Sequence, residues 1–344
     1  MLYTTTRSNA DTFTVHRVLH SQRAPDGGQF LPFHLPVFSQ DDLIQQYKGS
    51  FNDRVARVLN ILFSKQLTGY DIDLALGKRS VRMQQLNQRL FTAECWHNPQ
   101  WDYSGMEKQL LYLICDEKDS EPAISDWAEI GIRMAVLFGI VGEMVVNGLA
   151  SQEKPVDLAM LSGNFSAPMA AWYARGMGLP IGNIVCCCNE NSALWDFICH
   201  GQLRTDGIAR RTMIPEADIM IPKHLEHLIS LYGGPAEVAY YVDCLHMGKT
   251  YYAEDGLIRR LRQGIYVTVS SENRILNTVS NSFSTHKYLL ALSSSLPYAG
   301  LQDYRARTGE SRTAVILTEK SPRLDMEAIS GLTGISDREL EQYL

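Results

Sequence analysis

The sequence predicts an α/β fold built on a parallel sheet, and three observations support this prediction. Residues 156–161 and 184–188 are apolar runs of the length of buried strands, and a helix-forming stretch at 169–177 lies between them. A strand, a helix and a strand at this spacing form a βαβ unit, which places two parallel strands in one sheet. The 344-residue chain is 45% apolar, which is enough to cover such a sheet with a buried core.

Local patterns predict the other elements in order along the chain. Residues 2–38 mix short strand-forming runs with a turn at 24–28, where proline and glycine set uncommon backbone angles. Apolar residues at helical spacing predict helices over 51–63 and 105–115. Further expected elements are a helix over 192–199, strands at 240–244, 266–269 and 314–317, and a terminal helix from about 337.

The segment 130–150 is the best candidate for a membrane span, but it predicts a buried helix instead. Arg133, Glu143 and Asn147 interrupt it before the roughly 20 apolar residues that a span needs. Residues 1–9 are polar and lack the apolar core of a signal peptide. We therefore expect a cytoplasmic protein without a membrane partner.

Charge and cysteine content exclude two classes of partner. The net charge of -6 argues against nucleic acid, because phosphate backbones are bound by clustered Lys and Arg. None of the seven cysteines forms a CxxC pair or has a histidine at zinc spacing. Cys186, Cys187 and Cys188 are consecutive, and neighbours on a strand point to opposite faces. We expect reduced, packed thiols and no metal site.

Two loops, at 162–168 and 189–191, follow predicted strands. They lie at the sheet edge where ligands of open α/β sheets bind. The loop 162–168 also precedes a helix, whose free N–H groups and positive dipole end favour an anion. The alternatives are that this loop only connects strand to helix, and that Asn191 or Ser192 only caps the next helix. The candidate binding residues are Ser162, Gly163, Asn164, Phe165, Ser166, Asn189, Glu190 and Asn191.

Several motifs resemble those of threonine synthases and occur in the same order as in that family. Residues 3–7 (YTTTR) and 24–32 (APDGGQFLP) resemble the family's YxSTRG and APDGGLFVP. Residues 162–167 (SGNFSA) resemble its TGNFGN or TGNFGD loop. Further similarities to the family's YAKKMGLP, TNEND and MDIxxP lie at 173–180, 189–191 and 218–222.

This resemblance implies the pyridoxal-phosphate (PLP) fold type II, which is tryptophan-synthase-β-like and has a parallel sheet core. It implies an amino-terminal segment over 1–120 with a degenerate lysine helix, and a large α/β domain over 121–344 with a glycine-rich anion loop. The family carries a small mobile domain with an SGDTG loop between its lysine helix and its SINWARI segment. Here residues 124–130 (ISDWAEI) follow Cys115 within about ten residues, so we expect the small domain to be largely deleted.

The match fails at the residue that carries the family's chemistry. Residues 94–105 resemble ELFHGPTLAFKD, in which the lysine binds PLP covalently, and Ser104 takes the position of that lysine. A serine hydroxyl cannot form a Schiff base, so we expect no covalently bound PLP. Non-covalent binding of PLP or phosphate at the loop 162–166 remains possible on this sequence.

Other departures concern charge. Asp126 and Glu129 stand where SINWARI has asparagine and arginine, so a phosphorylated substrate would meet two carboxylates there. Lys108, one helical turn after Ser104, is an alternative amine or simply a surface lysine near Glu107.

Two histidines are candidates by family position alone. His97 lies in the lysine segment, and His286 lies in residues 284–287, which resemble the family's DPHT. The threonine of DPHT faces the pyridine nitrogen of PLP, and Lys287 would replace it.

Three functions follow from these expectations. The first is a pseudoenzyme that binds a small anionic ligand or a partner protein. The second is a repurposed enzyme that uses the same crevice without a lysine imine. The third is a genuine PLP-dependent lyase of amino-acid biosynthesis, converting phosphohomoserine to threonine. A homodimer is a further expectation.

Overall fold

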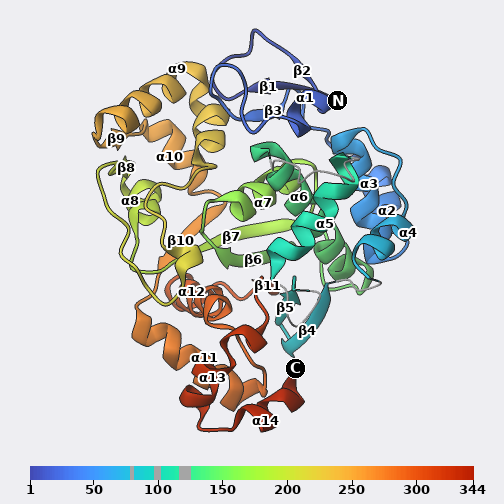
Figure 1. The fold of residues 1–344 in the computed structure, drawn as a ribbon, viewed down its shortest axis with the longest axis vertical. Coiled ribbons are helices and arrows are strands. Elements are labelled where there is room, and N and C mark those ends of the chain that lie inside the picture. Colours follow the sequence, from blue (N-terminus) through green and yellow to red (C-terminus); the bar gives the residue numbers. More distant parts are fainter. Residues whose placement is uncertain (78–80, 97–101, 116–124) are drawn as a thin grey trace.

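A six-stranded sheet forms the centre of the molecule (Figure 1). The computed structural model describes residues 1–77, 81–96, 102–115 and 125–344. The strand order is β10-β7-β6-β11-β5-β4, and all neighbours are parallel except β4 and β5. This confirms the predicted parallel sheet and adds one antiparallel edge strand. The bounds are β4 (Arg82–Asn87), β5 (Leu90–Glu94), β6 (Val156–Leu161), β7 (Ile181–Cys188), β10 (Ile265–Val269) and β11 (Ala314–Thr318).

The parallel register brings distant parts of the chain to one sheet edge. Thr318 of β11 pairs with Glu94 of β5, and Leu161 of β6 pairs with Cys187 of β7. The carboxyl ends of β5, β6 and β11 therefore point the same way, and the segments that follow them meet there. Ligands of open parallel sheets bind at this end.

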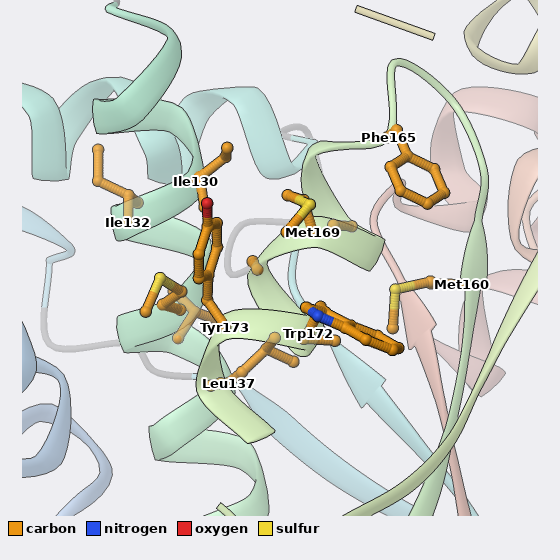
Figure 2. Close-up of a cluster of buried hydrophobic side chains, with 14 of the residues drawn as sticks. Ile130, Ile132, Leu137, Met160, Phe165, Met169, Trp172 and Tyr173 are labelled. Atoms are coloured by element: carbon orange, nitrogen blue, oxygen red, sulfur yellow. The ribbon is translucent and has the colours of Figure 1, made fainter. Parts of the chain in front are cut away.

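Helices cover both faces of the sheet. On one face lie α6 (Asp126–Val146) and α7 (Ser166–Gly176), whose side chains form the buried cluster of Figure 2 together with Met160 of β6. On the other face lies α12 (Leu292–Thr308), which packs on β6, β7, β10 and β11. The cysteine triplet alternates as predicted, with Cys187 in the core under α12 and its two neighbours in the other core.

The amino-terminal segment forms its own small antiparallel sheet of β1 (Leu2–Thr5), β2 (Phe13–Thr14) and β3 (Phe30–Pro32). The predicted turn at 24–28 is present, and Gly27 adopts φ +76°, a left-handed conformation that glycine reaches without strain. The ring of Tyr3 packs 5.8 Å from that of Trp127 in α6, which attaches this sheet to the core.

The remaining helices surround this framework. Three of them, α2, α3 and α4, begin with capping boxes in which Ser or Thr and an Asp three residues later bond each other's backbone. The helices are α1 (Val15–Leu19), α2 (Gln40–Tyr47), α3 (Phe51–Phe63), α4 (Gly69–Ala75), α5 (Tyr103–Cys115), α8 (Ala193–His200), α9 (Leu225–Met247), α10 (Asp255–Leu261), α11 (Glu272–His286), α13 (Met326–Thr333) and α14 (Asp337–Leu340). A separate antiparallel pair is formed by β8 (Gln202–Leu203) and β9 (Tyr251–Tyr252), which lie on either side of α9 in the sequence.

Two sequence predictions are wrong in detail. The strand predicted at 240–244 lies inside α9, because a short apolar run has no period that separates a strand from a buried helix. The helix predicted from Met169 begins at Ser166, because Pro168 lies in its first turn, where a missing N–H is tolerated.

Only ten residues separate the end of α5 at Cys115 from the start of α6 at Asp126. A separate domain needs at least about 50 residues, so no domain lies between these two helices, and the deletion of the family's small domain stays a prediction of the sequence. Among the described residues, no helix combines the length and apolarity needed to cross a membrane.

Candidate functional site

A pocket of about 280 Å³ opens where the segments after β5, β6 and β11 meet. It unites two predicted features, because Ser104 and the loop after β6 line the same cavity. The lining residues are Asp102, Tyr103, Ser104, Glu107, Arg133, Leu161, Ser162, Gly163, Asn164, Ser166, Ala167, Glu216, Ile219, Ser293, Glu319 and Lys320.

The loop after β6 offers backbone donors to this pocket. Gly163 and Phe165 have φ of +43° and +74°, and their left-handed turn leads directly into α7. The N–H groups of Gly163, Asn164 and Ala167 have no acceptor within the described part of the chain, whereas Ser166 N bonds the Asn164 side chain at 3.0 Å. Unpaired N–H groups at a helix amino terminus are donors for an anion.

Ser166 stands where the resembling motif has its second glycine, and it sits in the loop without backbone strain. The positive φ angles fall on Gly163 and Phe165, while Ser166 is the first residue of α7. Its hydroxyl donates to Asn164 Oδ1 at 2.7 Å. The substitution of glycine by serine is therefore compatible with the shape of the loop.

Ser104 lies at the start of α5, where Asp102 caps the helix. Asp102 Oδ1 accepts from the Ser104 backbone N–H at 3.0 Å and from the Ser104 hydroxyl. Lys108, one turn further, is exposed and does not line the pocket, whereas Glu107 does. His97 lies outside the described residues, so its candidacy stays a prediction.

The pocket lining also contains a partly buried arginine clamp. Arg133 of α6 donates to both carboxylate oxygens of Glu319, at 2.6 and 3.4 Å. Its guanidinium lies 4.0 Å from the centre of the Tyr103 ring. Burial alone would lower the pKa of Arg133, but the charge and hydrogen bonds of Glu319 and the charge of Glu107 hold it well above the ordinary value. Arg133 therefore stays positively charged and holds Glu319 in place.

The Glu107 carboxylate has fewer hydrogen-bond donors than the Glu319 carboxylate. It is 8% exposed, and its Oε1 has no hydrogen-bond donor among the described residues. The nearest charge is Arg133 Nε, at 3.9 Å. Burial raises the pKa of the Glu107 carboxyl to about 7; Arg133 opposes this rise, and Glu129 and Glu319 add to it. The pocket therefore contains a carboxyl group that titrates near neutral pH.

Glu107→Gln is expected to stabilise the protein at pH 8 by about 1–2 kcal/mol. Between pH 4.5 and about 7 the unfolded state has released the Glu107 proton and the folded state has not, so stability falls as pH rises. The full pKa shift of Glu107 corresponds to a destabilisation of about 3 kcal/mol at pH 8. The amide of glutamine is also buried without a partner and keeps part of this cost, so the expected gain is smaller. Urea unfolding at pH 5 and pH 8 measures this, and a gain that is equal at both values would contradict it.

Asp126 and Glu129, expected to repel a phosphate, are paired with cations outside the pocket. Lys223 Nζ lies 2.5 Å from Asp126 Oδ1 and 3.4 Å from Glu129 Oε2, and His224 Nε2 lies 2.9 Å from the latter oxygen. Burial alone would raise the pKa of Glu129, but the hydrogen bond and charge of His224 lower it well below its usual range. Glu129 Oε1 also accepts from the Asn164 side chain at 2.6 Å, which holds the anion loop.

Asn189, Glu190 and Asn191 do not line the pocket. Asn189 and Asn191 donate to Asp218 Oδ1 at 2.7 and 3.1 Å, and Glu190 pairs with Arg210. These bonds fix the segment that carries Glu216 and Ile219, which do line the pocket. Their contribution to the site is therefore to position that segment.

His286 and Lys287 lie elsewhere, at the end of α11. His286 Nε2 lies 3.0 Å from the Tyr298 hydroxyl, and the Lys287 amine lies 5.1 Å from the Phe283 ring centre. Neither lines the pocket, whereas Ser293 at the start of α12 does.

Sequence reasoning missed Arg133, Ser293, Glu319 and Lys320. Glu319 and Lys320 directly follow β11, so the rule that ligands bind beyond strand ends would have found them. Arg133 and Ser293 carry no such signal, because they reach the pocket through helix packing.

Comparisons with known proteins agree with this geometry. The family described as "Threonine synthase N terminus" matches residues 2–76. Human "Threonine synthase-like 1" is 31% identical over 153 residues, which cover 43% of this chain and 20% of that protein. Threonine synthase of Saccharomyces cerevisiae is 33% identical over 104 residues, covering 30% of this chain and 20% of that protein. The chain thus aligns with about a fifth of the length of these relatives.

Solved structures show the same fold over nearly the whole chain. PLP-bound threonine synthase from Brucella melitensis has a TM-score of 0.85 at 18% identity, and covers 97% of this chain and 92% of that one. Threonine synthase from yeast has a TM-score of 0.79 at 15% identity, and covers 99% and 93%. At these identities the likeness concerns the fold alone.

Proposed function

Because this chain belongs to the threonine synthase family, we propose that it is a member without covalent PLP chemistry that binds a small anionic ligand non-covalently. One observation carries the proposal: Ser104 lines the same pocket as Gly163, Asn164 and Ala167, whose backbone N–H groups have no acceptor among the described residues. The side of the pocket suited to an anion is retained, while the residue at the family's lysine position has no amine.

The residues of the pocket fit the phosphate group of PLP. The N–H groups of Gly163, Asn164 and Ala167 would hold its phosphate, and the α7 dipole would add to the attraction. Bound PLP would supply an electron sink for carbanion chemistry. Lys320 contributes an amine to the pocket lining, but its Nζ pairs with Asp325 Oδ1 at 2.7 Å. A protonated, paired ammonium is not a nucleophile, so we expect binding without a covalent bond.

Borohydride reduction in the presence of PLP, followed by peptide mapping, tests this proposal. The wild-type protein is expected to bind PLP reversibly, with no pyridoxyl group on Lys108 or Lys320. The Ser104→Lys variant is the matched control, because it places an amine at the same helix position and should become labelled. The variant is not expected to convert phosphohomoserine to threonine. Only ten residues join α5 to α6, which is too few for the family's small domain and its SGDTG loop.

Two outcomes would refute the proposal. A pyridoxyl lysine in the wild-type pocket would select the genuine PLP lyase instead. Absence of any saturable binding of PLP and inorganic phosphate would show that the loop only connects β6 to α7.

The alternative of a repurposed enzyme has one supporting observation. The Glu107 carboxyl is buried in the pocket, has an unpaired oxygen and has its pKa raised to about 7 by burial, as a general acid or base requires. Turnover of a pocket ligand that Glu107→Gln abolishes, without loss of binding, would select this alternative. A partner protein and a homodimer stay predictions of the sequence.

A further inference from the structure

The loop after β6 is tied to a fully buried histidine that lies outside the pocket. Asn164 Nδ2 of the loop donates to Glu129 Oε1 at 2.6 Å, and the other oxygen of that carboxylate lies 2.9 Å from His224 Nε2. The backbone N–H of His224 also donates to the Asn164 carbonyl at 3.0 Å. His224 is 0% exposed and does not line the pocket, so it acts on a ligand only through Glu129 and the loop.

The second ring nitrogen of His224 meets an amide whose orientation is fixed. Gln29 Nε2 donates to the Lys223 carbonyl at 2.6 Å, which leaves Gln29 Oε1 facing His224 Nδ1 at 3.1 Å. If the amide were turned round, two oxygens that only accept would meet at the Lys223 carbonyl. His224 Nδ1 therefore has to be the donor in its contact with Gln29.

Both ring nitrogens of His224 thus face acceptors. A neutral imidazole has one donor and one acceptor, so it would bring two acceptors together either at Gln29 or at Glu129, whereas the imidazolium donates to both. A proton held by Glu129 instead is disfavoured, because Asn164 donates to that carboxylate and Lys223 Nζ lies 3.4 Å from it. Despite burial, the pKa of Glu129 lies well below its usual range, which agrees with a proton on His224.

We propose that His224 is a buried imidazolium, and that it positions Glu129 and Asn164 so that the loop presents its N–H groups to an anion. This assignment rests on the proposed function, because it concerns how the same loop binds its ligand. His224 touches no ligand and is a positioning residue. Its hydrogen bond to a carboxylate is charge-assisted, which makes it stronger and more directional than a neutral one.

The ion pairs beside His224 are balanced without it. Among the described residues, three cations and three carboxylates are joined by ion pairs there. The imidazolium therefore adds one net positive charge next to the carboxylate that holds the loop. This charge would attract an anion at the loop, and by linkage a bound anion would favour the proton on the imidazole. The cations are Arg7, Arg23 and Lys223, and the carboxylates are Asp126, Glu129 and Glu226.

Nitrogen-15 NMR of protein labelled at histidine reads the ring protons directly at pH 7. Two protonated ring nitrogens are expected for His224, and His224→Gln identifies its signals. Burial and the charge of His224 lower the pKa of His227 well below its ordinary value, so His227 should carry a single ring proton. Glu129→Gln removes the opposite charge and should leave His224 with a single ring proton as well.

Sulfate is the binding probe, because its charge does not change near neutral pH and it cannot react with a lysine. If Glu129 only repelled anions, Glu129→Gln would bind sulfate more tightly than the wild type. The positioning role predicts the opposite, a loss of about tenfold, because the variant loses both the imidazolium charge and the carboxylate that orients Asn164.

His227→Gln is the matched control for the binding measurement. His227 is as buried as His224 and lies three residues further along α9, but its Nδ1 lies 3.0 Å from the Tyr173 hydroxyl and not at the loop. This variant should bind sulfate within about twofold of the wild type. Thermal unfolding of each variant confirms that the compared proteins are folded.

The outcomes separate this assignment from the proposed function. A single ring proton on His224 in the wild type would overturn the imidazolium. Sulfate binding by Glu129→Gln that equals or exceeds that of the wild type would overturn the positioning role and leave anion binding intact. If the wild type binds neither sulfate nor inorganic phosphate, the proposed function fails and the positioning role fails with it, whatever the NMR spectrum shows.

Discussion

Arg133→Met is expected to lower the free energy of unfolding by about 2–3 kcal/mol, because it leaves a partly buried carboxylate without its partner. Arg133 donates two hydrogen bonds to Glu319 and covers the Tyr103 ring, and no other described cation lies within ion-pair distance of Glu319. Urea unfolding at pH 8 measures the loss. The same variant should also weaken ligand binding, since Glu319 and Tyr103 line the pocket.

Arg175→Met is the matched control for this prediction. Arg175 also lies over an aromatic ring, 4.2 Å from the centre of Trp172, but within the described ranges it has no carboxylate partner. Its replacement should cost about 1–2 kcal/mol, the combined size of one cation–π contact and one hydrogen bond. Equal losses for the two variants would mean that the Arg133–Glu319 pair adds nothing.

Gly163→Val is expected to lower the affinity for phosphate-bearing ligands about a hundredfold. Gly163 adopts φ +43°, which a β-branched residue reaches only with strain, so the loop should change its backbone path. The N–H groups of Gly163, Asn164 and Ala167 would then lose their positions in the pocket lining, and each lost bond to a charged phosphate is worth about 1.5–3 kcal/mol. Titration with inorganic phosphate and with PLP measures the affinity.

Gly148→Val controls for backbone strain. Gly148 has φ +70°, and a side chain there would meet open space in the turn after α6, away from the pocket. The control should lose stability and keep ligand affinity. If Gly163→Val binds as tightly as the wild type, the loop amides are not the anion site.

Local sequence patterns determined a large part of the fold. The βαβ unit around Val156–Leu161 was predicted from an apolar run, a helical stretch and their spacing, which act over short distances along the chain. The facing of the cysteine triplet followed from the two-residue period of a strand. The strand predicted at 240–244 failed because a short apolar run is compatible with α9 as well.

The sequence by itself determined that Ser104 replaces the lysine of the family motif and that a glycine-bearing loop precedes α7. The tertiary structure decided what surrounds them, because charge pairs form between residues far apart in the chain. Asp126 and Glu129 suggest repulsion of a phosphate when read alone, yet Lys223, just before α9, forms ion pairs with both. Arg133 and Glu319 meet only because β11 pairs beside β5 and β6, so no local pattern could reveal this ion pair. Since Arg133 bonds Glu319, it does not bond Glu107 Oε1, and this second consequence was equally invisible in the sequence.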